Sequence, residues 1–217
     1  MKAFEHQMAD IDRMTGFDRV TLQFYDETAP TYMASGQGGV SRHLVSFLAT
    51  LPPRARILEL GCGGGRDAQA MMAAGHNVDA TDGSAAIALK AEAILGIPVR
   101  VMLFEQLEAL AVYDAVWASA SLLHVPRAGL PDVLARILRA LKPGGLHHAT
   151  YKGGGQEGHD KHGRYFNYLS EQQMIEMYLK SGPWNILATS AYTGGGYDDG
   201  ARGPWVAITA QRPIWRE

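Results

Sequence analysis

The segment ILELGCGGGRD, Ile57–Asp67, contains an apolar run, a glycine-rich turn and the start of a helix-forming stretch. Its first residues predict a buried strand of a parallel sheet, because such strands are covered on both faces. Gly61, Gly63 and Gly65 form a G-x-G-x-G turn, and glycine lets the backbone approach a ligand closely because it has no Cβ. Asp82 ends the next apolar run, 21 positions after Gly61. A ribose-binding acid occupies this place in βαβ nucleotide sites, so the stretch predicts a nucleotide-binding unit.

The spacing of the turn also separates kinds of nucleotide site. The dinucleotide fingerprint G-x-G-x-x-G ends in glycine or alanine, but Arg66 occupies that last position when the count starts at Gly61. This departure disfavours a site for NAD. A Walker P-loop requires a Gly-Lys-Ser/Thr run, and the sequence contains none.

The composition predicts an ordinary globular domain. The chain has 217 residues, of which 47% are apolar, and a formal net charge of −2. This length favours a single domain with one core, and the charge gives no general attraction to nucleic acid or to an anionic membrane. The apolar runs are shorter than the ~20 residues that span a bilayer, and the first residues are too polar for a secretory signal. Cys62 is the single cysteine, so no intrachain disulfide is expected and the cytoplasm is the expected compartment.

Helix and strand signals alternate along most of the chain. Helices are expected at Phe17–Tyr25, Ser41–Leu51 with Ser41 as N-cap, Arg66–Ala74, Ala85–Leu95, Pro131–Leu141 and from the Ser170 cap to Leu179. Strands are expected at Arg56–Leu60, Asn77–Thr81, Val99–Phe104, Tyr113–Ser119, Leu146–Tyr151, Trp184–Thr193 and Trp205–Arg212. A polar, glycine-rich loop is expected over Lys152–Tyr168.

This alternation predicts an α/β fold with a mostly parallel sheet covered by helices on both faces. The last two strands have no helix between them, which predicts one antiparallel strand. Ligands of such open sheets bind beyond the carboxyl ends of the strands, near the topological switch point.

The order of motifs resembles that of class I S-adenosylmethionine-dependent methyltransferases, from about Phe24 to Arg212. The features that carry the resemblance are the E-x-G-x-G-x-G turn, Asp82, the pair Phe104-Glu105, the segment WASASLLHV and the turn LKPGG. The pattern is similar to general methyltransferase-domain and tellurite-resistance-type proteins that act on small molecules. The resemblance implies a Rossmann-like three-layer sandwich whose seven-stranded sheet has its last strand antiparallel. It also implies one domain over residues 1–217, with a helical cap over about 1–52 and a core over 53–217.

The resemblance implies S-adenosylmethionine as cofactor, S-adenosylhomocysteine as product and a small-molecule acceptor. The residues that it places at the cofactor are Glu59, Gly61, Cys62, Gly63, Gly65, Arg66, Asp82, Gly83, Phe104, Glu105, Ala118 and Ser119.

The physical roles of these residues leave alternatives open. Glu59 suits the cationic methionine amino group, or an ion pair with Arg66. Asp82 suits the two ribose hydroxyls, or the start of the helix that follows it. Phe104 suits the adenine ring, or the core. Cys62 is interpreted as a small residue in a tight turn rather than as a nucleophile.

The candidate catalytic residue is His124, the only titratable group in the segment after the fourth strand. A histidine accepts a proton near neutral pH, although a structural role in the loop is an equal alternative. The N-P-P-Y or D-P-P-Y motif of amide and DNA N-methyltransferases is absent, and so is a Pro-Cys dipeptide. Methyl transfer to a good nucleophile needs little beyond alignment.

Two segments are candidates for covering the reacting centre. Tyr25 and Tyr32 lie in the N-terminal segment. Arg164 and Phe166 lie in the glycine-rich loop, whose residues 153–166 we interpret as a lid. A solvated connector is the alternative for that loop.

His159, Asp160 and His162 do not predict a metal site, because no cysteine joins them and their geometry is not set by the sequence. His147 and His148 are consecutive in a strand, so at most one would face the site.

Two other functions are compatible with the sequence. A catalytically silent protein that binds S-adenosylmethionine is one, because methyltransferases need no diagnostic catalytic residue. An NAD-dependent reductase is the other and is disfavoured by Arg66. The sequence indicates neither the acceptor nor the oligomeric state.

Overall fold

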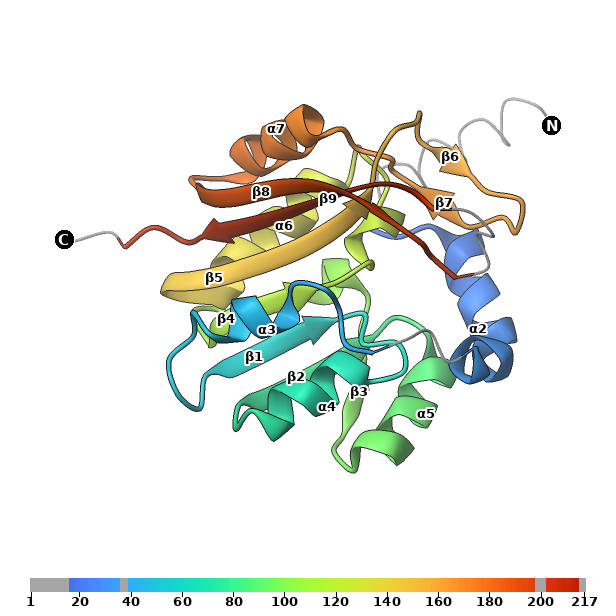
Figure 1. The fold of residues 1–217 in the computed structure, drawn as a ribbon, viewed down its shortest axis with the longest axis horizontal. Helices are drawn as coiled ribbons and strands as arrows, with labels where there is room; N and C mark the ends of the chain where they lie inside the picture. Colours follow the sequence, from blue (N-terminus) through green and yellow to red (C-terminus); the bar gives the residue numbers. More distant parts are fainter. Residues whose placement is uncertain (1–15, 36–38, 198–201, 215–217) are drawn as a thin grey trace.

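The computed structural model describes residues 16–35, 39–197 and 202–214. A seven-stranded sheet in the order β3-β2-β1-β4-β5-β9-β8 lies between layers of helices (Figure 1). The strands are β1 (Arg56–Leu60), β2 (Asn77–Asp82), β3 (Val99–Val101), β4 (Tyr113–Ala118), β5 (Leu141–Lys152), β8 (Asn185–Gly194) and β9 (Gly203–Gln211). The helices are α2 (Arg19–Ala34), α3 (Leu44–Leu48), α4 (Arg66–Ala73), α5 (Ala85–Leu95), α6 (Leu130–Ala140) and α7 (Glu171–Ser181), with short 3-10 turns η1 (Phe104–Gln106) and η2 (Leu122–His124).

The strand directions confirm the predicted Rossmann-like topology. Strands β3, β2, β1, β4 and β5 are parallel to their neighbours. Strand β9 pairs antiparallel with both β5 and β8, so the last strand is the antiparallel one. The chain order reverses between β1 and β4, and this switch point places the glycine turn after β1 beside the segment after β4.

The two faces of the sheet are covered by different helices. Alternate residues of a strand point to opposite faces, so Ile57 of β1 packs with Phe47 of α3 and Met71 of α4. Helix α5 joins the same layer through a cluster of small apolar side chains that it shares with α4 and β2. Leu58 and Leu60 face the other way and pack with α6 and α7.

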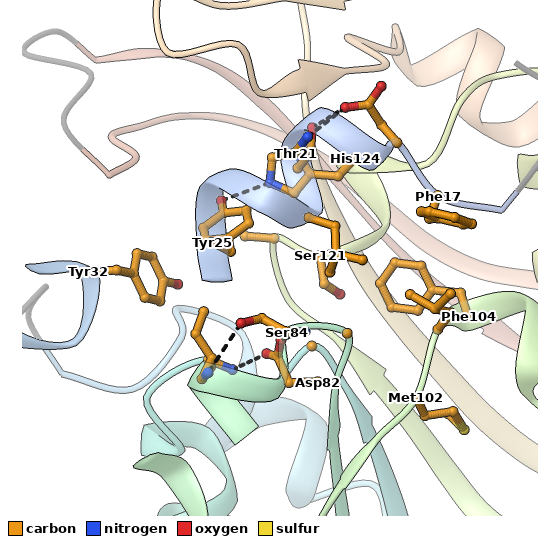
Figure 2. A pocket seen from close by; sticks show the side chains of 18 residues that line it. Phe17, Thr21, Tyr25, Tyr32, Asp82, Ser84, Met102, Phe104, Ser121 and His124 are labelled. Atoms are coloured by element: carbon orange, nitrogen blue, oxygen red, sulfur yellow. Dashed lines mark hydrogen bonds between the residues drawn. The ribbon is translucent and has the colours of Figure 1, made fainter. Parts of the chain in front are cut away.

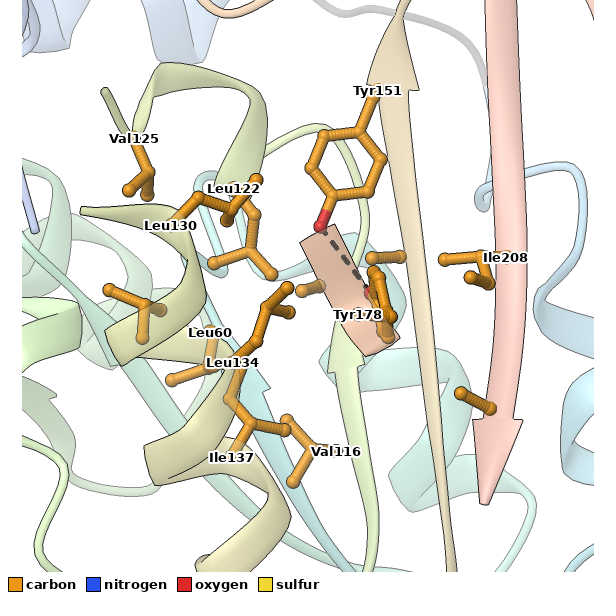
Figure 3. Close-up of a cluster of buried hydrophobic side chains, with 14 of the residues drawn as sticks. Leu60, Val116, Leu122, Val125, Leu130, Leu134, Ile137, Tyr151, Tyr178 and Ile208 are labelled. Atoms are coloured by element: carbon orange, nitrogen blue, oxygen red, sulfur yellow. Dashed lines mark hydrogen bonds between the residues drawn. The ribbon is translucent and has the colours of Figure 1, made fainter. Parts of the chain in front are cut away.

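The larger core lies between the sheet and helices α6 and α7 (Figure 3). Helix α6 contributes Leu130, Leu134 and Ile137, all fully buried. The hydroxyls of Tyr151 and Tyr178 also lie in this core, 3.3 Å apart, so each polar atom has a partner. Burying polar groups without partners is costly, and this pair lets β5 and α7 pack closely around two tyrosines.

The N-terminal helices differ from the prediction in both length and cap. Helix α2 begins after Asp18, whose side chain caps the Thr21 amide at 2.7 Å, and it continues through Pro30 to Ala34 rather than ending at Tyr25. Helix α3 spans five residues, and Ser41 is not its N-cap. The Ser41 amide instead donates to Asp67 of α4 at 2.8 Å, so this residue joins two elements.

Two other predicted elements are wrong in detail. The third strand ends at Val101, and Phe104 begins the turn η1 instead of ending the strand. The stretch 152–168 is not simply a loop, because β6 (Gly158–His159) and β7 (Tyr165–Phe166) form a hairpin within it. Among the described residues, no helix is long and apolar enough to cross a membrane.

Candidate functional site

A pocket of about 690 Å³, counting the space open to solvent, lies at the carboxyl ends of β1, β2 and β4 and beneath α2. The predicted site residues that line it are Tyr25, Tyr32, Gly61, Gly63, Asp82, Gly83, Phe104 and His124. The residues of the lining that the sequence did not single out are Phe17, Asp18, Thr21, Leu22, Ser84, Ile87, Met102, Leu103, Ala120 and Ser121. Phe17 and Phe104 lie at one end of the pocket, and Tyr25 and Tyr32 lie toward the other (Figure 2).

The glycine turn brings the backbone against the segment that follows β4. Gly61 has a φ of +75°, and a Cβ built on it would lie 2.5 Å from Cβ of Ser121. Gly63 has a φ of +52°, and its Cβ would lie 3.1 Å from the Tyr32 hydroxyl. Both positions require glycine for conformation and for space. Gly65 is buried and precedes α4, outside the pocket lining, and Arg66 is exposed on the first turn of that helix.

Asp82 is held at the end of β2 with its carboxylate at the pocket. One oxygen accepts the Gly63 amide at 3.0 Å and the other accepts the Ser84 amide at 2.9 Å. Burial raises the pKa of Asp82 to about 6, although these two hydrogen bonds oppose the shift. Each carboxylate oxygen keeps acceptor capacity, so Asp82 can receive a pair of hydroxyls. Ser84, rather than Asp82, caps helix α5.

Glu59 lies in the sheet beneath the glycine turn and outside the pocket lining. It is buried, and its Oε2 has no hydrogen-bond partner among the described residues. The ion pairs of the described residues do not include the alternative pair of Glu59 with Arg66. Burial, with Asp67 and Asp82 nearby, raises the pKa of Glu59 well above its usual range. A cationic group brought beside it would offset this effect.

Cys62 is buried in the cluster that α4 and α5 share, and it does not line the pocket. Burial raises the pKa of its thiol. A thiol becomes a nucleophile through its thiolate, so this environment agrees with the interpretation of Cys62 as a small packing residue.

The apolar end of the pocket suits a flat ring. Phe17 and Phe104 form it, and the other apolar side chains in the lining of the pocket include Leu22, Ile87, Met102 and Leu103. Glu105, which the resemblance places at the cofactor, does not line the pocket. Its carboxylate accepts the Gly16 amide at 2.8 Å and so fixes the chain that leads into α2.

The residues after β4 are shifted relative to the prediction. Ala118 is buried in the core and Ser119 lies outside this pocket, where its hydroxyl is 2.8 Å from that of Ser41. The pocket is lined instead by Ala120 and Ser121. The Ser121 hydroxyl donates to the Leu60 carbonyl at 2.6 Å, which ties the ends of β4 and β1 together.

His124 forms a hydrogen-bonded pair with Tyr25 of α2. Its Nδ1 lies 2.6 Å from the Tyr165 carbonyl, an acceptor only, so Nδ1 carries the hydrogen. Nε2 therefore accepts from the Tyr25 hydroxyl at 3.0 Å (Figure 2). Burial lowers the pKa of His124 to about 4 and raises that of Tyr25. The pair is consequently a neutral imidazole and a neutral phenol at pH 7.

Arg164 and Phe166 lie behind this pair, outside the lining of the pocket. The Arg164 guanidinium is nearly fully buried and makes two contacts with Asp160, at 2.7 and 2.9 Å. It also lies 5.2 Å from the ring centroid of Phe24 and 5.4 Å from that of Phe166. The end of the predicted lid is therefore packed between α2 and the core instead of being a solvated connector.

Other polar residues from the sequence analysis lie elsewhere. His159 contacts Asp18 at 3.1 Å, and Asp160 binds Arg164. His147 and His148 are both buried, and neither lines the pocket. Within the described ranges, no group of three or more His, Cys, Asp or Glu residues is placed to hold a metal ion.

Comparisons with known proteins show what this chain is similar to. The family described as "Methyltransferase domain" matches residues 57–145, the span from β1 to the start of β5. The sequence matches no curated protein.

Similar solved structures cover most of the chain. A SAM-dependent methyltransferase from Methanosarcina mazei is 16% identical, with a TM-score of 0.71, over 82% of this chain and 100% of that one. The 1,6-didemethyltoxoflavin-N1-methyltransferase of Burkholderia thailandensis, solved with bound 1,6-didemethyltoxoflavin and S-adenosylhomocysteine, is 20% identical, with a TM-score of 0.72, over 89% of this chain and 88% of that one. The [4+2]-cyclase SpnF is 19% identical, with a TM-score of 0.71, over 89% of this chain and 95% of that one.

At these identities the similar structures show the fold alone, and the family match covers residues 57–145. The glycine turn and the pocket lie at the switch point of the strand order, where open α/β sheets bind their ligands. The chain has the Rossmann-like fold of class I methyltransferases, and its residues 57–145 match the methyltransferase-domain family.

Proposed function

We propose that this protein transfers a methyl group from S-adenosylmethionine to a small-molecule acceptor and releases S-adenosylhomocysteine. The observation that carries the proposal is the pocket that joins Gly61, Gly63 and Asp82 to the Tyr25–His124 pair. It combines a nucleoside seat with a proton-carrying pair, and it lies at the switch point of the sheet. The cytoplasm is the proposed compartment, on the ground of the single cysteine.

The residues present fit the proposed cofactor. Asp82 would receive the ribose hydroxyls, and the apolar end around Phe104 would hold the adenine ring. Glu59 has a buried oxygen without a partner among the described residues, which suits a positively charged amino group nearby. When bound, the cofactor supplies a methyl group on a sulfonium, which has a good leaving group.

The Tyr25–His124 pair would manage the acceptor's proton. Nε2 of His124 already accepts from Tyr25, so an acceptor hydroxyl or amine would donate to the Tyr25 oxygen as the Tyr25 proton moves to Nε2. The Tyr165 carbonyl, bound to Nδ1–H, would stabilise the resulting imidazolium. Such a transfer avoids a free tyrosinate, which the raised pKa of Tyr25 disfavours.

Helix α2 and the hairpin β6–β7 would form the cover of the site. The Tyr165 amide donates to the Thr21 hydroxyl at 2.7 Å, and His159 contacts Asp18. These contacts link the predicted cap to the predicted lid, so the two would exclude water from the reacting centre together.

The proposal is tested by assaying formation of S-adenosylhomocysteine from S-adenosylmethionine with a panel of small metabolites. Turnover with at least one acceptor supports a methyltransferase. Tight cofactor binding without turnover on a broad panel would favour the silent binding protein, and the likeness to a [4+2]-cyclase shows that this fold also supports another reaction.

Cofactor affinity should depend on pH through Asp82. The pKa of about 6 in the free protein means that the carboxyl becomes protonated below pH 6, and a protonated oxygen no longer accepts a ribose hydroxyl. We expect the affinity for S-adenosylhomocysteine to be nearly constant from pH 7 to 8 and to fall by up to about tenfold per unit below pH 6. Calorimetric titrations between pH 5 and 8 measure this. Asp82→Asn should remove the dependence, and an equal slope in that variant would assign it to another group.

The cap and the hairpin should respond to the cofactor together. Because Thr21 and Tyr165 are hydrogen-bonded, ordering of one segment orders the other. We expect amide exchange over residues 19–34 and 158–166 to slow in parallel when S-adenosylhomocysteine binds, and Thr21→Val to uncouple the two segments. Exchange that slows in only one segment of the parent protein would show that they move independently.

A further inference from the structure

A second cavity, of about 490 Å³ including the space open to solvent, lies at the same edge of the sheet as the pocket. It is built on β4, β5, β8 and β9, whereas the pocket is built on β1, β2 and β4. The residues of its lining that matter here are Arg42, His43, Ser119, Ala120, Tyr192 and Trp205. No aspartate or glutamate lines it among the described residues.

Ala120 lines both the pocket and the second cavity. Its φ of +54° is a left-handed conformation that is rare for residues other than glycine, and its amide donates to the Thr150 hydroxyl at 2.8 Å. Such strain persists where surrounding contacts enforce it, often at functional sites. The short side chain at this border would let a molecule in the second cavity reach toward the Tyr25–His124 pair.

The walls of the second cavity are aromatic and flat. The rings of Tyr192 and Trp205 are stacked, 6.2 Å apart at an interplanar angle of 19°. The His43 ring lies 5.3 Å from the Tyr192 ring. Aromatic walls of this kind favour a flat, largely apolar body of a ligand.

The polar groups of the second cavity favour an anion. The guanidinium of Arg42 lies 4.9 Å from the Tyr192 ring centroid, and no carboxylate of the described residues forms an ion pair with it. Nε2 of His43 is buried and has no hydrogen-bond partner in the part of the chain that the structure describes. A guanidinium binds a carboxylate through two parallel hydrogen bonds.

We propose that the second cavity binds the methyl acceptor and that the acceptor is a flat carboxylic acid. Its carboxylate would pair with Arg42, its ring would lie against Tyr192 and Trp205, and its nucleophile would point past Ala120 to the pocket. This inference rests on the proposed function and adds to it the chemical class of the substrate.

The test uses 4-hydroxybenzoate and its uncharged analogue 4-hydroxybenzamide as probes. Both are titrated into the protein, with and without saturating S-adenosylhomocysteine, and binding is measured by calorimetry or ligand-detected NMR. Two variants test the second cavity, Arg42→Gln and Gly195→Phe. Gly195 lines the cavity and a Cβ built on it meets no other atom, so the phenylalanine ring would fill part of the cavity. The control is Arg54→Gln, which changes an exposed arginine at the amino end of β1.

We expect the acid to bind about tenfold or more tightly than the amide. Arg42→Gln should abolish this preference and Gly195→Phe should abolish acid binding, while Arg54→Gln behaves like the parent. Equal binding of acid and amide, failure of both to bind, or a preference that survives in Arg42→Gln would overturn the inference. The proposed function is judged separately, by whether the parent binds S-adenosylhomocysteine, because the probes are also titrated without it.

Discussion

Replacing His124 by asparagine should lower methyl-transfer turnover by about 100-fold or more, which is the usual contribution of a positioned proton acceptor. The variant removes Nε2, the atom that accepts from Tyr25 at 3.0 Å. Cofactor affinity should change little, since the ribose and adenine ends of the pocket are built from other residues. Initial rates and calorimetric affinities on the same preparations measure the two effects.

The partner residue and a control sharpen this result. Tyr25→Phe should lower turnover similarly, because the phenol is the member of the pair that would touch the acceptor. His76→Asn, in the turn between α4 and β2, should leave turnover unchanged. Normal turnover in His124→Asn would reject the proton-transfer role and leave a structural one, in which Nδ1 binds the Tyr165 carbonyl.

Replacing Asp82 by alanine should weaken S-adenosylmethionine binding by about ten- to a hundredfold, the effect of losing roughly 1.5–3 kcal/mol of hydrogen bonds to a charged acceptor. The carboxylate also accepts the amides of Gly63 and Ser84, so the variant would loosen the glycine turn as well. Asp79→Ala is a matched control on the same strand, because Asp79 pairs with the exposed Arg56 away from the pocket. Parent-like affinity in Asp82→Ala would show that the nucleoside seat is misplaced.

Motifs that are local in sequence were the predictable part of the site. The positions of Gly61, Gly63 and Asp82 follow from the glycine turn and from the strand ends beside it, and the structure places all three in one pocket. The fold was also predictable, because apolar runs alternate with helix-forming segments and the final pair lacks a helix. The assignment of cofactor-binding roles to these residues stays a prediction.

Contacts between distant segments were not predictable. Tyr25 and His124 are 99 positions apart, and each was a separate candidate until the packing of α2 joined them. No pattern in the sequence indicates that Glu105 accepts a hydrogen bond from the Gly16 amide. None indicates that Arg164 is buried beside Asp160. The pair that lines the pocket after β4 lies two residues later than predicted, because Ala120 and Ser121 take the place of Ala118 and Ser119. A period-two pattern identifies a strand but not the point where its end meets a ligand.

We propose above all that the pocket binds S-adenosylmethionine. Parallel calorimetric titrations of the purified protein with S-adenosylmethionine and with NAD at pH 7.5 test it most directly. We expect one S-adenosylmethionine to bind per chain, with a lower affinity in Asp82→Ala, and no detectable binding of NAD. Binding of NAD in preference to S-adenosylmethionine, or no binding of S-adenosylmethionine by the folded protein, would contradict it.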